Sequence, residues 1–62
     1  MNAYQDIDDK IIAAVRGGKT TFTDILSHVG GEFRVIDRRL QALRKRGLLM
    51  YSRKTGWHEF QA

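Results

Sequence analysis

The stretch from Glu32 to Arg46 constrains the fold of this chain more than any other. Its apolar residues Ile36, Leu40 and Leu43 are spaced i, i+4 and i+7, which places them on one stripe of a helix. The side opposite that stripe carries four polar side chains at the same helical spacing: Arg34, Arg38, Gln41 and Lys45. The pattern therefore predicts a helix over 32–46 with one buried face and one basic face.

The basic face of this helix has the chemistry of a nucleic-acid reader. Arg and Gln side chains can make bidentate hydrogen bonds to base edges, and Lys and Arg neutralise phosphates. No acidic residue interrupts the row. A charge run is also typical of an ordinary solvated helix, so a basic face that only keeps the protein in solution stays open as an alternative.

The length of 62 residues predicts one small domain. A chain this short buries only about 60% of the surface that its unfolded form exposes, so its core is small. It contains no cysteine, and His28 and His58 lie far apart, which argues against disulfides and structural zinc. We expect no cofactor. No apolar run is long enough to span a bilayer and no signal peptide is evident, so a cytoplasmic protein without a membrane partner is expected.

The positive charge is concentrated in the second half of the chain. The net charge is +4, and the segment from Arg34 to Lys54 holds eight basic residues but only one acid, Asp37. A polyanionic partner is the natural inference. The sequence contains no nucleophile–base pair and no metal-binding cluster, so we expect neither enzymatic activity nor a small-molecule substrate.

Two further helices are predicted before the basic one. The first covers 3–16, with Asn2 as its cap and an inward face of Tyr4, Ile7, Ile11, Ala14 and Val15, whereas Ile12 points outward. The second covers 22–29, because Thr21 and Asp24 match a capping box and apolar residues follow at helical spacing. Phe33 is expected to pack against this second helix.

A β-hairpin is predicted over 48–60. Its turn, from Arg53 to Gly56, projects two cations and places Gly56 where a positive φ is needed. If Arg53 pairs with Trp57, one face of the hairpin carries Leu49, Tyr51, Trp57 and Glu59. An isolated hairpin is marginally stable in water, so this one must pack on the helices.

This order of elements resembles the winged helix-turn-helix family of DNA-binding domains. The likeness rests on 22–30 and on 36–49, where the spacing of Leu40, Leu43, Gly47 and Leu48 is close to the usual exit from a recognition helix into a wing. It covers nearly the whole chain, from about Tyr4 to Phe60. Gly31 and Glu32 depart from the family's usual turn and cap residues. The resemblance implies a single domain, 1–62, of mainly α structure with a small β-hairpin: a three-helix winged helix-turn-helix.

The resemblance also implies sequence-specific binding of double-stranded DNA by a small transcriptional regulator, of the kind that phages and mobile elements encode. Helix 32–46 would enter the major groove and the 53–56 wing tip would lie on the backbone or minor groove. The implied DNA-binding residues are Arg34, Arg38, Gln41, Lys45, Arg53, Lys54, Lys19 and Thr21. A domain of this size buries a modest interface, so we expect a homodimer or a protein partner on the DNA.

Two other functions stay open. Winged helices also serve as protein–protein interaction modules, and the aromatic side chains of Tyr51 and Trp57 would suit such a surface. An RNA-binding winged helix is the other alternative, because readers of single strands stack bases on aromatic rings.

Overall fold

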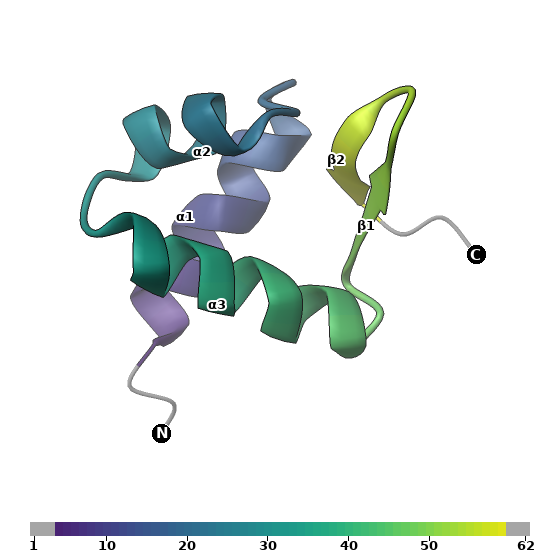
Figure 1. The fold of residues 1–62 in the computed structure, drawn as a ribbon. Coiled ribbons are helices and arrows are strands. Elements are labelled where there is room, and N and C mark those ends of the chain that lie inside the picture. Colours follow the sequence, from purple (N-terminus) through teal and green to yellow (C-terminus); the bar gives the residue numbers. More distant parts are fainter. Residues whose placement is uncertain (1–3, 60–62) are drawn as a thin grey trace.

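The computed structural model of the chain describes residues 4–59 and contains three helices followed by an antiparallel hairpin (Figure 1). Its elements are α1 (Gln5–Arg16), α2 (Phe22–Val29), α3 (Phe33–Lys45), β1 (Leu49–Ser52) and β2 (Gly56–Glu59). The fold is the expected mainly α, three-helix winged helix-turn-helix with a small hairpin. The predicted cap at Asn2 and the start of the first helix at residue 3 lie outside the described residues, as does Phe60.

The bounds of the helices follow the apolar periodicity of the sequence. α2 has the predicted range, and α3 is one residue shorter than predicted at each end. α2 begins after Thr21, whose hydroxyl oxygen accepts a hydrogen bond of 3.1 Å from the backbone N–H of Asp24. This bond satisfies one of the amide groups that a helix start leaves unpaired. Among residues 4–59, no helix has the length and apolar character needed to cross a bilayer.

The core lies where the three helices and the hairpin meet. Its largest fully buried side chains come from the three helices and β1: Ile11, Ile25, Ile36, Leu40, Leu43 and Leu49. The predicted stripe of α3 is therefore confirmed as its buried face. Two expectations for α1 are wrong, because Tyr4 is 45% exposed and Ile12 is partly buried against the core. α1 packs against α2, α3 and β2, so its buried surface is wider than one stripe.

The hairpin stands at the C-terminal end of α3 and its tip rises toward the start of α2 (Figure 1). Tyr51 pairs with Trp57, so the expected pairing of Arg53 with Trp57 is wrong by two residues and Arg53 lies in the turn. A shift of two residues leaves each side chain on its predicted face, because side chains alternate with a period of two. Leu49 and Trp57 accordingly close the core from the same face.

Two contacts attach β2 to the helices. The backbone N–H of Trp57 donates a 2.8 Å hydrogen bond to the carbonyl of Thr20, in the connection between α1 and α2. At the other end of β2, Nε of Arg16 lies 3.0 Å from the carboxylate of Glu59. The backbone hydrogen bond anchors β2 to the connection between α1 and α2, whereas the ion pair, whose side chains are 65% and 40% exposed, adds little to it.

The sequence predicts that Phe33 packs against α2, but more than half of this residue is exposed. It is the first residue of α3 and 58% of its surface is exposed. Side chains of a helix lean toward its N-terminus, so the side chain of a first residue extends beyond the helix end instead of over the neighbouring helix. The guanidinium of Arg34 lies 6.0 Å from the centre of the Phe33 ring.

Candidate nucleic-acid interface

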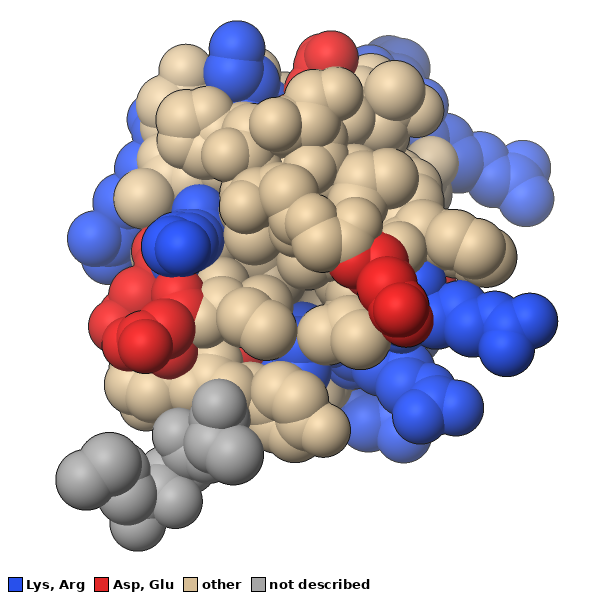
Figure 2. All heavy atoms as spheres, turned by 90° about the vertical axis from the view of Figure 1, so that its left-hand side faces the viewer, with Lys and Arg blue, Asp and Glu red and all other residues tan. Residues whose placement is uncertain are grey.

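α3 presents its polar row to solvent. Because Ile36, Leu40 and Leu43 are buried, the opposite side of the helix faces outward. Arg34, Arg38 and Lys45 are exposed, and Gln41 is half-buried. In Figure 2, Lys and Arg side chains project along the right-hand edge, the side on which α3 lies, whereas basic and acidic side chains meet along the left-hand edge. The side of the molecule on which α3 lies is therefore mostly basic in this view.

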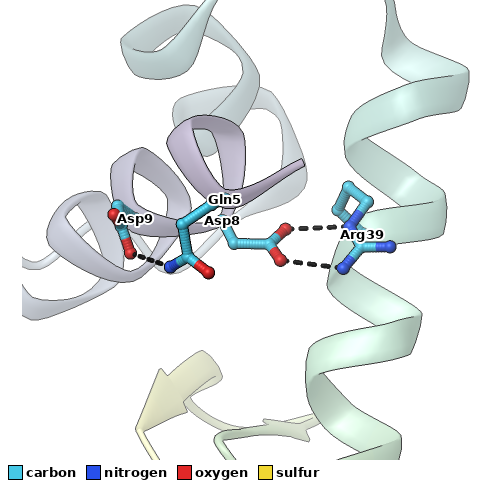
Figure 3. A network of polar contacts seen from close by, with 4 residues as sticks. All are labelled: Gln5, Asp8, Asp9 and Arg39. Atoms are coloured by element: carbon cyan, nitrogen blue, oxygen red, sulfur yellow. Dashed lines mark hydrogen bonds and ion pairs between the residues drawn. The ribbon is translucent and has the colours of Figure 1, made fainter. Parts of the chain in front are cut away.

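One arginine of α3 is not part of this surface. Nε and Nη2 of Arg39 each donate a 2.8 Å hydrogen bond to the carboxylate of Asp8 on α1 (Figure 3). The two side chains are only 17% and 3% exposed. The guanidinium also lies 4.7 Å from the centre of the Tyr4 ring, a cation–π distance. Arg39 therefore serves to hold α1 against α3, and its charge is compensated inside the protein.

The buried pair has a clear electrostatic consequence. The hydrogen bonds that Arg39 donates to the Asp8 carboxylate raise the pKa of Arg39 above its ordinary value, against the opposing effect of burial. The guanidinium stays charged at every pH at which the protein would be handled. A charged pair at this depth fixes the rotation of α3 about its axis, because Arg39 must point at Asp8. That rotation decides which residues of α3 face solvent.

The sequence contains a signal for this pair, which lies in the positions of the two residues on their helices and not in the overall pattern of charge. Asp8 stands at i−3 and i−7 from Ile11 and Val15, so it lies on the apolar stripe of α1. Arg39 stands in the same way between Ile36 and Leu43 on α3. A single charge on an apolar stripe is expected to have a buried partner of opposite sign. Asp8 and Arg39 are a pair of that kind.

The cations at the wing tip lie next to the start of α2. Arg53 and Lys54 are exposed in the turn, where the backbone N–H of Lys54 donates to the hydroxyl of Ser52 at 3.2 Å. A hollow of about 320 Å³ separates the tip from α2, and Thr21 lines its other wall. Three predicted residues thus border one hollow. Lys19 is exposed but does not line it.

Gln41 faces a second hollow, between α3 and the hairpin. This hollow has a volume of about 240 Å³ and is lined by Phe22, Asp37, Gln41, Arg44, Tyr51 and Trp57. Only Gln41 of these was expected to bind DNA. Arg44 and Tyr51 join it because the hairpin turns back beside α3, which the sequence does not reveal. The predicted residues therefore lie in several places: Arg34, Arg38 and Lys45 on the exposed row, Gln41 where the row meets this hollow, Arg53, Lys54 and Thr21 at the wing tip, and Lys19 apart from both hollows.

Comparison of this chain with protein-family models, with curated proteins and with solved structures found no match. What the chain binds must follow from its own side chains. Within residues 4–59, no three or more His, Cys, Asp or Glu side chains gather as a metal site. The polar row of α3 carries three exposed cations and an amide, and it lies next to the cationic turn of the hairpin. These side chains offer hydrogen-bond donors to phosphates and to base edges.

Proposed function

We propose that this chain binds double-stranded DNA in a sequence-specific manner and acts as a small transcriptional regulator, with a binding and not a catalytic role. The observation that carries the proposal is the row of Arg34, Arg38, Gln41 and Lys45 opposite the fully buried stripe of α3. A helix with this arrangement can lie in the major groove with its basic face toward the bases, while its apolar face stays in the core.

The base contacts are assigned to the N-terminal half of α3. Arg34 and Arg38 are one turn apart on the outward face, and an arginine can donate two parallel hydrogen bonds to guanine. Gln41, one turn further and nearer the hairpin, would contact a base or a phosphate. Lys45 stands at the end of the helix, where it would neutralise a backbone phosphate.

The remaining contacts are assigned to the DNA backbone. Arg53 and Lys54 at the wing tip would lie on an adjacent minor groove or its phosphates. Lys19 and Thr21, before α2, would bind a phosphate on the same side as the tip. Arg39 is excluded, because Asp8 already compensates its charge. With five or six phosphates neutralised, log affinity should fall with log salt concentration at a slope of about −5.

We propose that this regulator acts in the cytoplasm. A single module of this size contacts a short stretch of DNA, so specific binding calls for a homodimer on a two-fold site or for a protein bound beside it. The total accessible surface of the described structure is only 4680 Å², which leaves little room for a larger interface.

A fluorescence-anisotropy titration of a labelled duplex at several salt concentrations tests the proposal. We expect the Arg34→Ala/Arg38→Ala variant to lose about 30-fold or more in affinity for a selected site, because two base-reading arginines are removed. The Lys10→Ala variant is the control for the single Arg38→Ala variant: each removes one exposed cation, but Lys10 lies on α1. Equal losses in these two variants, or no binding by the wild type at low salt, would contradict the proposal.

A further inference from the structure

Tyr51 is exposed on the face of the hairpin that otherwise closes the core. It shares this face with Leu49 and Trp57, both of which are buried, yet 55% of its own surface is exposed. Its ring meets the Trp57 ring edge-on, with centroids 5.3 Å apart and planes at 61°. The buried Trp57 thus supports one side of Tyr51, and much of the phenol ring remains open to a ligand.

Three hollows meet at this ring. The hollow between α3 and the hairpin and the hollow below the wing tip both include Tyr51 among their lining residues. A third hollow of about 280 Å³ lies at the C-terminal end of α3 and is lined by Arg44, Gly47, Leu49, Met50 and Tyr51. Tyr51 is the one residue that lines all three hollows, and we call the three together the groove, which extends from the C-terminal end of α3 to the wing tip.

Cations border this groove on both sides of Tyr51. Arg44 lines the two hollows nearer α3, and Arg53 and Lys54 line the one at the tip. Phe22, which is half-buried, adds a second aromatic surface. Asp37 is the only acid among the residues that line the three hollows. Binding of a single strand requires cations along the nucleic-acid backbone and aromatic rings on which the bases stack.

We propose that this groove binds an unpaired nucleotide of single-stranded DNA or RNA, with its base stacked on Tyr51 and its flanking phosphates held by Arg44, Arg53 and Lys54. This goes beyond the proposed reading of duplex DNA. In a duplex the faces of each base are covered by its neighbours, so a ring can stack on a base only where the strand is unpaired. The cations of the α3 row, Arg34, Arg38 and Lys45, do not line the groove. The two kinds of binding can therefore be separated by mutation.

The test is a fluorescence-anisotropy titration with labelled single strands of about 12 nucleotides, within the usual site size of such grooves. One strand is DNA, one is RNA of the same sequence, and the matching DNA duplex is titrated beside them. We expect Tyr51→Ala to weaken binding of the single strand by about 5- to 100-fold, because a stacked base is lost. Tyr51→Phe keeps the ring and should bind nearly as well as the wild type. The comparison of DNA with RNA identifies the strand that is preferred.

Two results would overturn the proposal: equal binding of the single strands by the wild type and Tyr51→Ala, or an equal loss by this variant toward single strand and duplex. Tyr51→Ile keeps a strand-forming apolar side chain without a ring, so it replaces Tyr51→Ala if that variant does not fold. The Arg34→Ala/Arg38→Ala variant should retain its binding of the single strand. If it loses duplex binding while Tyr51 proves irrelevant to single strands, the groove proposal fails and the duplex proposal stands.

Discussion

Two parallel hydrogen bonds, both 2.8 Å long, join Arg39 of α3, whose side chain is 17% exposed, to the buried carboxylate of Asp8 of α1. The pair joins residues 31 positions apart and sets the rotation of α3. It also separates two adjacent arginines by function. Arg38 is exposed on the outward face, whereas Arg39 is held against α1.

Asp8→Asn should strongly destabilise the protein. The change leaves the Arg39 guanidinium buried without its counter-charge, which costs about 3–5 kcal/mol in free energy of unfolding. A domain of this length has a total stability of about 3–9 kcal/mol, so part of the variant should be unfolded at 25 °C. Urea unfolding followed by the fluorescence of Trp57, the single and buried tryptophan, measures the loss. The double variant Asp8→Leu/Arg39→Met removes both charges and should recover much of the stability. An Asp8→Asn variant as stable as the wild type would refute this account.

Arg38→Ala and Arg39→Ala should affect different properties of the protein, the first its affinity for DNA and the second its stability. Loss of Arg38 removes an exposed cation, so DNA affinity should fall while the urea midpoint stays within experimental error of the wild type. Loss of Arg39 leaves the Asp8 carboxylate buried and unpaired, so the midpoint should fall sharply. Duplex affinity measured on the folded fraction should change little. A DNA-binding loss that is equal in the two variants would show that Arg39 also reaches the ligand.

The sequence predicts the architecture because each element has a clear local pattern. The stripe of Ile36, Leu40 and Leu43 defines the buried face of α3, and Thr21 defines the start of α2. The positive φ of Gly56, at 76°, also follows from its place in the turn. Such features depend on residues a few positions apart, and local spacing is what a single sequence reveals.

The groove and the buried pair could not be predicted in the same way. Arg44 and Tyr51 line one hollow because the chain reverses at Gly47, and Asp8 meets Arg39 because α1 crosses α3. Both depend on the packing angles between elements, which periodicity leaves open. The exposure of Phe33 was not predicted, for a related reason. The sequence shows that Phe33 lies beside the apolar stripe of α3, but its position at the N-terminus of the helix decides where its side chain points.

Gly56→Ala should detach or distort the wing, and Gly47→Ala supplies a matched comparison. The two glycines have nearly the same φ, 76° and 77°, so each alanine costs about 1–2 kcal/mol of conformational free energy. A Cβ on Gly47 would meet open space, whereas one on Gly56 would collide with the backbone carbonyl of Thr20. Relief of that collision must displace the carbonyl that accepts from the N–H of Trp57.

We therefore expect Gly56→Ala to lose about 3 kcal/mol or more of unfolding free energy, and Gly47→Ala only its conformational cost. Urea unfolding gives both values, and hydrogen exchange of the Trp57 amide reports on the bond to Thr20. If the two variants are equally stable, β2 is not held tightly against the connection between α1 and α2.

Asp37→Asn should strengthen binding to DNA in general and weaken selection among sequences. Asp37 is exposed on the side of α3 that faces the hairpin, and it lines the same hollow as Gln41 and Arg44. A carboxylate there repels phosphates, and in the major groove it can accept a hydrogen bond from the amino group of cytosine. Two unit charges 4 Å apart in water interact by about 1 kcal/mol, so affinity for random duplex at low salt should rise about fivefold.

The matched control for this last change is Asp6→Asn, which alters the net charge equally but lies on α1. It should raise affinity far less, because Asp6 lies two residues from Asp8 and so about 200° around α1 from the side that contacts α3. Competition between a selected site and random duplex gives the selectivity, which should fall for Asp37→Asn and stay constant for Asp6→Asn. Equal gains in both variants would mean that only total charge matters, and the carboxylate of Asp37 would then have no part in choosing the site.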